Sequence, residues 1–409
     1  MRILVTAAGS HGDVAPYTGL GVRLVEAGHE VVLATHGSYA GMVERCGLEF
    51  RPLPGDPRRS GSGEAGGRGG MLRRAKEFVG ELGRGIAEVA EPGADVLLLS
   101  TSTAPLGWHV AEALGVASAG VYLQPVEPTG EFGPVVGGAR SLGRWGNRAA
   151  GRAALGVVDR LHRDAVAELR ARLGLPPLSG PAMRRRLVDG QWPALHGFSA
   201  ALVRRPADWR PGLDVVGNWW PAGTGELPVG VEEFLAAGPP PVFVGFGSMG
   251  AGRGERLGRI AVEALRAAGQ RGVLQAGWAG LTADGDDDDV LTVGQLDHAA
   301  LFPRMAAVVH HAGAGTAASA LRAGVPSVPV PVTADQPFWA RRLTAIGAAV
   351  APVPFGGLTA ERLAAAIRSA VAEPSHRESA AAAAARMAEE DGAGRVVDLV
   401  TRLARRTGG

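Results

Sequence analysis

Apolar runs of strand length alternate with helical segments along this chain, and the whole alternation occurs twice. The runs are continuous rather than alternating in polarity, which is typical of strands buried on both faces of a parallel sheet. In the first half the expected strands cover residues 2–7, 30–34, 95–99, 118–123 and 198–203, with helices near 15–27, 38–46, 103–114 and 145–172. This order predicts an α/β fold, a doubly wound parallel sheet with helices on both faces.

A second series follows a proline-rich stretch, residues 205–240, which we interpret as the linker. Its expected strands cover 241–246, 272–276, 290–293, 306–310 and 327–330, with helices near 256–267, 298–305, 314–323, 335–346 and 359–371. A chain of 409 residues has room for two such domains. We predict an N-terminal domain over 1–210, a C-terminal domain over 211–390, and a last helix within 391–409 that packs back on the first domain.

Three local patterns refine this outline. Ser375 and Glu378 have the spacing of a capping box and predict the start of an alanine-rich helix. Residues 55–70 and 128–142 have little to bury and are expected as loops, which in an α/β sheet can border the ligand crevice. The three successive arginines 184–186 are expected on a solvated face rather than against a membrane.

Composition excludes several classes of protein. Hydrophobic residues make up 46% of the chain and charged residues 20%, as in ordinary globular proteins. The 42 basic and 40 acidic residues leave a net charge of +2, too small a field for a nucleic-acid partner. Cys46 is the single cysteine, so an intramolecular disulfide is impossible. Without a secretory leader or a run of about 18 apolar residues, we expect a cytoplasmic protein that does not insert into a membrane.

The most informative motif is the strand AAVVH followed by His311, Ala312, Gly313, Ala314, Gly315 and Thr316, and then by a helix. The two glycines let backbone N–H groups approach an anion, and the helix N-terminus favours a phosphate. Thr316 offers a hydroxyl and His311 a ring N–H to phosphate oxygens. The pattern predicts a pyrophosphate site. A tight turn with ordinary helix-cap chemistry is the alternative.

The same residues also match a dinucleotide fingerprint. Gly313, Gly315 and Ala318 have the required spacing, and Asp335 follows about 20 residues later, where a ribose-binding acid is expected. However, that fingerprint normally follows the first strand of its domain, and here it follows the fourth. A dehydrogenase is therefore the weaker interpretation.

Two more positions carry polar groups suited to a sugar and to proton transfer. Asp335 and Gln336 begin a helix and offer the acceptors and donors that fix vicinal hydroxyls of a hexose, unless Asp335 only caps that helix. Asp13 follows the first strand at the carboxyl edge of the sheet, where a carboxylate can accept a proton as general base or can cap a helix. His11 is a second phosphate donor, an orienting partner of Asp13, or a plain loop histidine.

Two long segments resemble a known family. HHAGAGTAASALRAGVPSVPVPVTADQPFWARRL is similar to the C-terminal nucleotide-sugar signature of family-one UDP-glycosyltransferases, in particular their bacterial natural-product and sterol-glucosyltransferase-like branch. MRILVTAAGSHGDVAPYTGLGVRLVEAGHEVVLATH resembles the amino-terminal part of that branch. The resemblance implies the GT-B fold, in which two Rossmann-like domains face each other across a cleft. The first domain binds the acceptor and the second binds the nucleotide-sugar donor.

The resemblance also implies roles for individual residues. Asp13 would be the general base, with His11 beside it, and Ser100 stands where histidine-using relatives keep an aspartate that orients the base. The stretch 293–298 lacks the Trp and Pro-Gln of plant relatives, so the choice between UDP and TDP stays open. The implied donor-binding residues are Gly247, Ser248, His298, His311, Gly313, Gly315, Thr316, Asp335 and Gln336.

The implied reaction is an inverting transfer of a hexose or deoxyhexose from a UDP- or TDP-sugar to a hydroxyl of a hydrophobic small molecule. The expected acceptors are polyketide, macrolide, aromatic or sterol-like, as in antibiotic biosynthesis. No cofactor and no metal are expected, because the acidic run 284–289 has the character of a solvated loop. Two alternatives remain: a sugar-nucleotide epimerase of the same fold, and a non-catalytic auxiliary protein.

Overall fold

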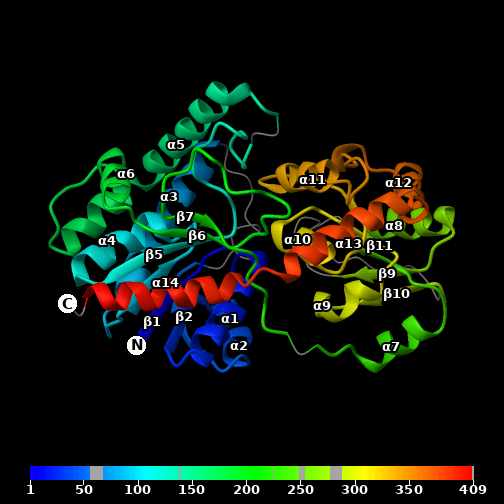
Figure 1. Ribbon diagram of the computed structural model, residues 1–409, viewed down its shortest axis with the longest axis horizontal. Helices are drawn as coiled ribbons and strands as arrows, with labels where there is room; N and C mark the ends of the chain where they lie inside the picture. The colour runs from blue at the N-terminus through cyan, green and yellow to red at the C-terminus, as the bar shows by residue number, and fades with distance from the viewer. Residues whose placement is uncertain (56–67, 138–139, 224, 248–253, 277–287, 408–409) are drawn as a thin grey trace.

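Two parallel β-sheets, one in each half of the chain, form the framework of this protein in a computed structural model (Figure 1). The structure describes residues 1–409 except 56–67, 138–139, 224, 248–253, 277–287 and 408–409. The two-sheet α/β architecture expected from the sequence is confirmed.

The first sheet has the strand order β3-β2-β1-β4-β5-β6-β7. Alternate residues of its strands enter two different cores, Leu4 on one face and Ile3 with Val5 on the other. Its strands are β1 (Arg2–Thr6), β2 (Glu30–His36), β3 (Glu49–Leu53), β4 (Val96–Leu99), β5 (Ala117–Tyr122), β6 (Ala194–His196) and β7 (Leu213–Val215). Its helices are α1 (His11–Glu26), α2 (Ala40–Glu44), α3 (Arg68–Ala90), α4 (Ala104–Leu114), α5 (Gly143–Arg172) and α6 (Gly180–Asp189).

The second sheet has the order β10-β9-β8-β11-β12. Phe243 enters one core, and Val242 with Val244 enters the other. Its strands are β8 (Val242–Gly245), β9 (Gly272–Gln275), β10 (Val290–Val293), β11 (Ala307–His310) and β12 (Ser327–Pro329). The helices of this half are α7 (Val229–Ala236), α8 (Gly254–Ala268), α9 (His298–Leu301), α10 (Ala314–Arg322), α11 (Gln336–Ala345), α12 (Ala360–Ala372) and α13 (Pro374–Ala388).

The last helix, α14 (Gly392–Thr407), returns from the second half to the first (Figure 1). Val396 and Val400 are fully buried in the core that also holds Ile3 and Leu24. The Trp219 indole N–H donates to the Gly392 carbonyl at 3.1 Å, which fixes the point where the chain crosses.

Four expectations from the sequence were wrong in detail. Residues 198–203 form turns, in which the Leu202 and Val203 N–H groups donate to the Ser199 carbonyl, and the strand before them is β6. The short edge strands β3 and β7 were missed because neither is a continuous apolar run. Pairing of β7 with β6 extends the first sheet to Val215, beyond the predicted boundary at 210. Helix α13 begins at Pro374, so Ser375 lies inside the first turn and no capping box forms.

The strand orders place two crevices. In each sheet the order reverses beside the first strand of its half, between β1 and β4 and between β8 and β11. Ligands of open α/β sheets bind outside the carboxyl ends of the strands at such a switch point. The segments that leave β1 and β11 contain Asp13 and His311, the residues on which the sequence placed its chemistry.

Candidate functional site

The Asp13 carboxylate lies in the first turn of α1, which starts at His11 instead of near residue 15 as predicted. Asp13 Oδ2 accepts hydrogen bonds from the Ser10 N–H at 2.9 Å and from the Ser10 hydroxyl at 2.7 Å. Among the residues that the structure describes, no hydrogen bond to the other oxygen, Oδ1, is found. The residue therefore caps the helix with one oxygen and keeps the second for another partner.

Gly9 makes room for this carboxylate. Its φ of +145° is a conformation that side-chain-bearing residues rarely adopt, and a Cβ there would lie 2.6 Å from Asp13 Oδ2. The Gly9 N–H donates to Nε2 of His36, at the end of β2, at 3.1 Å. The backbone before Asp13 is thus tied to the neighbouring strand of the sheet.

A chain of hydroxyl groups lies beneath this segment. The Ser102 hydroxyl donates to the Ala8 carbonyl at 2.7 Å and lies 3.1 Å from the Ser100 hydroxyl. The chain continues to Thr103, whose hydroxyl donates to the Thr6 carbonyl at 3.0 Å. Ser100 is buried at 4% exposure among neutral partners, so no second carboxylate orients the base from that position.

His11 contacts the other half of the molecule. Its Nε2 lies 2.6 Å from the Gln295 side-chain nitrogen, in the segment between β10 and α9. Because an amide nitrogen only donates, the ring nitrogen accepts in this contact. His11 therefore lies against the C-terminal half of the chain, and Ser10 holds the Asp13 carboxylate. Gln295 belongs to no motif that the sequence predicted as part of the site.

The His311 ring fits between two glycines. A Cβ at Gly313 would lie 2.5 Å from His311 Nε2, and one at Gly247 would lie 3.1 Å from His311 Cε1. Burial lowers the pKa of His311 to about 4, against the opposing effect of the Gly245 backbone, so the ring is neutral at neutral pH and has a single N–H to donate. Ser248, predicted beside Gly247, lies outside the described residues.

Helix α10 begins directly after this ring, with Gly313 as its N-cap. The first intrahelical bond runs from the Ala317 N–H to the Gly313 carbonyl, and the N–H groups before it lie at the helix start, where orphan donors collect. Gly315 is exposed and Thr316 is half-buried. Together with the helix dipole, these donors can bind an anion such as a diphosphate.

His298 is held by aromatic rings. It stacks on Phe302 with ring centroids 4.2 Å apart and meets Phe243 edge to face at 5.7 Å. Burial, together with the nearby His11 and His311, lowers the pKa of His298 to about 4, although Asp297 opposes the shift. His298 is thus a neutral ring close to both histidines.

Asp335 and Gln336 are both internally bonded. Asp335 Oδ2 accepts from the Trp339 indole N–H at 2.8 Å and does not cap the helix. Burial raises the pKa of Asp335, the negative charge of Asp13 raises it further, and hydrogen bonds from Trp339 and Gln124 oppose this. Gln336 is 5% exposed, and its Oε1 accepts from the N–H groups of Val332 and Thr333 at 2.8 and 3.1 Å, so its amide oxygen fixes this turn.

The structure brings the two predicted carboxylates together. The charge of Asp13 acts on Asp335 although the two residues belong to different halves of the chain. Gln124, from the segment after β5, also contacts Asp335 and was not identified from sequence, because a lone glutamine after a strand is no motif. The site therefore combines two electrostatically linked carboxylates, an anion-binding helix start and neutral histidines.

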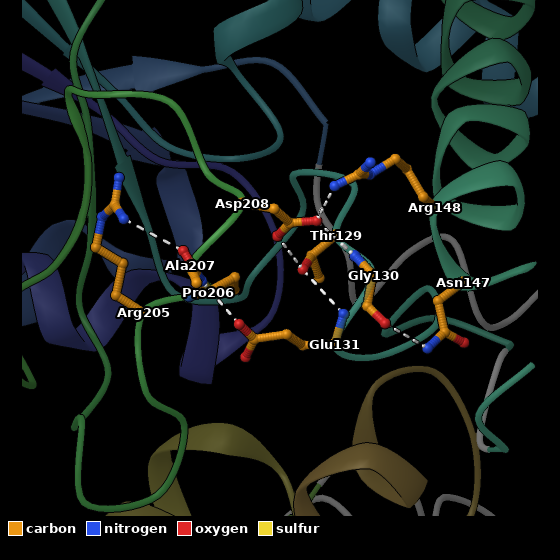
Figure 2. A network of polar contacts seen from close by, with 9 residues as sticks. All are labelled: Thr129, Gly130, Glu131, Asn147, Arg148, Arg205, Pro206, Ala207 and Asp208. Atoms are coloured by element: carbon orange, nitrogen blue, oxygen red, sulfur yellow. Dashed lines mark hydrogen bonds and ion pairs between the residues drawn. The ribbon is translucent and has the colours of Figure 1, made fainter. Parts of the chain in front are cut away.

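The segment after β5 is fixed by Asp208 (Figure 2). This carboxylate accepts from the Thr129 hydroxyl at 2.6 Å and the Gly130 N–H at 2.8 Å, and it pairs with Arg148 of α5. Burial raises the pKa of Asp208, but these three partners outweigh burial and lower it to about 2. The Ala207 N–H also donates to Glu131 Oε1 at 2.7 Å, so the loop at 129–131 is joined to the loop at 207–208 through both Asp208 and Glu131.

Comparison with known protein families matches both halves. Residues 3–117 match the glycosyltransferase family 28 N-terminal domain. Residues 285–403 match the C-terminal domain described as erythromycin biosynthesis protein CIII-like.

Curated relatives extend over nearly the whole chain. The O-mycaminosyltylonolide 6-deoxyallosyltransferase of Streptomyces fradiae is 37% identical, with 91% of this chain and 90% of the relative covered. A sterol 3-beta-glucosyltransferase of Arabidopsis thaliana is 34% identical over 96% of this chain, which spans 64% of that relative. The vancomycin aglycone glucosyltransferase of Amycolatopsis orientalis is 32% identical, covering 94% of this chain and 93% of the relative.

Solved structures agree on the fold. The glycosyltransferase of kitacinnamycin has a TM-score of 0.74 at 19% identity, covering 98% of both chains. VinC, solved in complex with DTDP, has a TM-score of 0.70 at 21% identity, covering 99% of this chain and all of VinC. Within the described ranges, no helix is long and apolar enough to span a bilayer, and no group of three or more His, Cys, Asp or Glu is placed to hold a metal ion.

Proposed function

The chain belongs to the glycosyltransferases of natural-product and sterol type, and from this premise we propose an inverting transfer of a hexose or deoxyhexose from a UDP- or TDP-sugar to a hydroxyl of a hydrophobic acceptor. Asp13 is the general base in this proposal. The resemblance of the sequence to nucleotide-sugar enzymes supports the donor class. The names of the relatives support the acceptor class, since they include an O-mycaminosyltylonolide 6-deoxyallosyltransferase, a sterol 3-beta-glucosyltransferase and a vancomycin aglycone glucosyltransferase.

One observation carries the proposal: the charge of Asp13, in the first half of the chain, raises the pKa of Asp335 in the second half. A base that serves transfer must lie beside the sugar carbon, and a carboxylate that holds sugar hydroxyls must lie on the other side of it. Asp335 starts the helix that follows β12, and the phosphate-type site follows the neighbouring strand β11. A nucleotide sugar with its diphosphate at α10 and its hexose at Asp335 would present its anomeric carbon to Asp13.

The proposed reaction is a single displacement. The acceptor oxygen forms a bond to the anomeric carbon while the bond from that carbon to the phosphate oxygen breaks. The acceptor proton passes to Asp13, and the nucleoside diphosphate leaves with the electron pair of the broken bond. An α-linked donor then gives a β-linked product. The free Oδ1 of Asp13 is the atom available to take this proton.

The departing charge is stabilised by neutral donors and the helix dipole in this proposal. His311 donates one N–H from a neutral ring, and the Thr316 hydroxyl and the N–H groups at the start of α10 add further donors. These groups replace a cation at the diphosphate, so we propose a reaction that needs neither metal nor cofactor. Activity in excess EDTA tests this, and restoration by Mg²⁺ or Mn²⁺ after a loss would contradict it.

The experiment for the overall function is an incubation of the protein with α-linked UDP- and TDP-hexoses and a panel of apolar aglycones. Mass spectrometry should show one hexose added to an acceptor, and the coupling constant of the anomeric proton should report a β-linkage. Conversion of the donor sugar without any acceptor would instead identify an epimerase. An α-linked product would contradict the single displacement.

A further inference from the structure

The start of α5 and the loop before it expose large apolar side chains. Trp145 is 84% exposed, the highest fraction among the large hydrophobic residues in the described part of the chain, and Leu142 and Val136 are 64% and 68% exposed. A solvated tryptophan costs free energy unless it has a partner. With the arginines named below, these three residues form what we call the α5 patch.

The packing of α5 fixes the direction of this patch. The opposite helix face holds Asn147, 1% exposed, which donates to the Gly130 carbonyl at 3.0 Å and accepts from the Leu142 N–H at 2.8 Å. One turn on, Gly151 packs so closely on Pro128 that a Cβ would lie 3.0 Å from its Cα. Figure 2 shows Asn147 and Arg148 directed at the loop. Trp145 therefore cannot turn inward without breaking this network.

The charge around the patch has one sign. Residues 132–158 contain four arginines and no aspartate, glutamate or lysine. Arg148 is paired with Asp208. Arg140, Arg144 and Arg152 are exposed and form no ion pair with the described residues. By contrast, two of the three arginines in the basic run 184–186 are paired within the fold, Arg184 with Asp159 and Arg186 with Glu112.

We propose that the α5 patch docks on the surface of an anionic lipid bilayer. Tryptophan with leucine and valine inserts at the level of the headgroups, and arginine side chains bind lipid phosphates while their stems lie along the apolar surface. Three apolar anchors and three cations give reversible docking rather than insertion.

A second copy of the chain is a poorer partner for this surface. A two-fold contact would bring the same arginines face to face, and the patch supplies no acidic residues to pair with them. Three apolar side chains are also far fewer than the 20 to 30 residues a side of a typical stable interface. The charge pattern is complementary to lipid phosphates and not to itself.

Docking would orient the acceptor side of the site toward the bilayer. The segment that ends in the α5 patch begins at Gln124, which contacts Asp335 in the site. This consequence rests on the proposed function, whereas docking itself does not.

Co-sedimentation with vesicles tests the docking. The full chain should bind vesicles of phosphatidylcholine mixed with phosphatidylglycerol. Its affinity for vesicles of phosphatidylcholine alone should be at least tenfold lower. Trp145→Ser should lower the binding about tenfold, and the pair Arg140→Gln with Arg144→Gln should reduce both the binding and its salt dependence. Val229→Ser, at a 73% exposed site in the other half, is the matched control and should leave binding unchanged.

Equal vesicle binding by wild type and Trp145→Ser, or no binding to anionic vesicles, would overturn the proposal. Dimerisation in sedimentation velocity that depends on Trp145, without vesicle binding, would identify a second copy as the occupant. Because Trp145 is exposed, its variant should melt at the wild-type temperature. Transfer to a water-soluble acceptor should be unaffected by Trp145→Ser, so loss of docking is distinguishable from failure of the proposed function.

Discussion

The two faces of the site are built from different materials. The face that we propose for the donor consists of glycines, a helix start and buried neutral histidines, with His311 enclosed between Gly247 and Gly313. The face that we propose for the acceptor consists of Asp13, neutral hydroxyls and a loop fixed by Asp208. A diphosphate is the same in every donor, so backbone geometry can specify it. On the proposed acceptor face, Asp13 is the carboxylate assigned to the reaction, whereas Asp208 is paired with Arg148 and holds a loop.

The largest expected effect separates the two faces through Asp13. Asp13→Asn should lower kcat about 10²- to 10⁴-fold and leave the Kd for nucleoside diphosphate unchanged, because the amide keeps the shape but accepts no proton. Kinetics and calorimetry measure these two quantities. Ser10→Ala is the matched control: it removes a hydroxyl donor but leaves the carboxylate, so kcat should fall less than tenfold. Unchanged turnover in Asp13→Asn would remove this residue from the mechanism.

Acid should weaken the donor face through His310. An unfolded histidine binds a proton below about pH 6.5, whereas burial lowers the pKa of His310 to about 3, so the stability it contributes is lost as pH falls from 6.5 toward 3. At pH 5 the loss is about 2 kcal/mol. Urea unfolding at pH 7 and pH 5 measures it.

His310→Asn sharpens this test. His310 Nδ1 accepts from the Ala312 N–H at 3.1 Å, and an asparagine oxygen can accept there without titrating. The variant should lose about 2 kcal/mol less than wild type between pH 7 and pH 5. Equal losses in both proteins would show that His310 titrates normally in the fold.

Glycine substitutions test how tightly the donor face is specified. Gly313→Ala places a Cβ 2.5 Å from His311 Nε2 and should displace the ring, costing about 1 to 3 kcal/mol in stability and weakening nucleoside diphosphate binding about tenfold. Thermal unfolding and calorimetry measure both effects. At Gly315, in the first turn of the same helix, a Cβ would meet no atom within 4 Å, so Gly315→Ala should keep the wild-type melting temperature. Equal melting temperatures for the two variants would contradict the close fit around His311.

Elements that repeat along the chain, or that belong to a motif, could be predicted from the sequence. The buried strands β1, β2, β4 and β5 and the helix start at Gly313 were predicted because continuous apolar runs and glycine spacing report them directly. Asp13 and Asp335 were selected on separate motifs, and in the structure the charge of Asp13 acts on Asp335.

The site residues and strands that the sequence did not predict depend on contacts between distant segments. Gln124 and Gln295 reach the site only when the two halves meet, and nothing local distinguishes them from surface glutamines. The edge strand β7 has three residues of mixed polarity, and its identity depends on pairing with β6. Gln336 was predicted to bind the sugar, but its side-chain oxygen accepts from the Val332 N–H, which leaves that oxygen less available to a ligand. The sequence does not reveal the shape of this turn, so this bond could not be predicted.

The smallest expected effect tests whether the acceptor face needs its hydroxyl chain for catalysis. Ser102→Ala removes the hydrogen bond to the Ala8 carbonyl and should lower the free energy of unfolding by about 1 kcal/mol, measured by urea unfolding. The hydrogen-bonded series of Ser100, Ser102 and Thr103 contains only neutral hydroxyls and brings no charged group near Asp13. The pH profile of kcat should therefore keep its wild-type shape. A displaced profile would mean that the hydroxyls tune the base. The proposed acceptor face would then not depend on the Asp13 carboxylate alone, and the contrast with the proposed donor face, which is shaped by its backbone, would no longer hold.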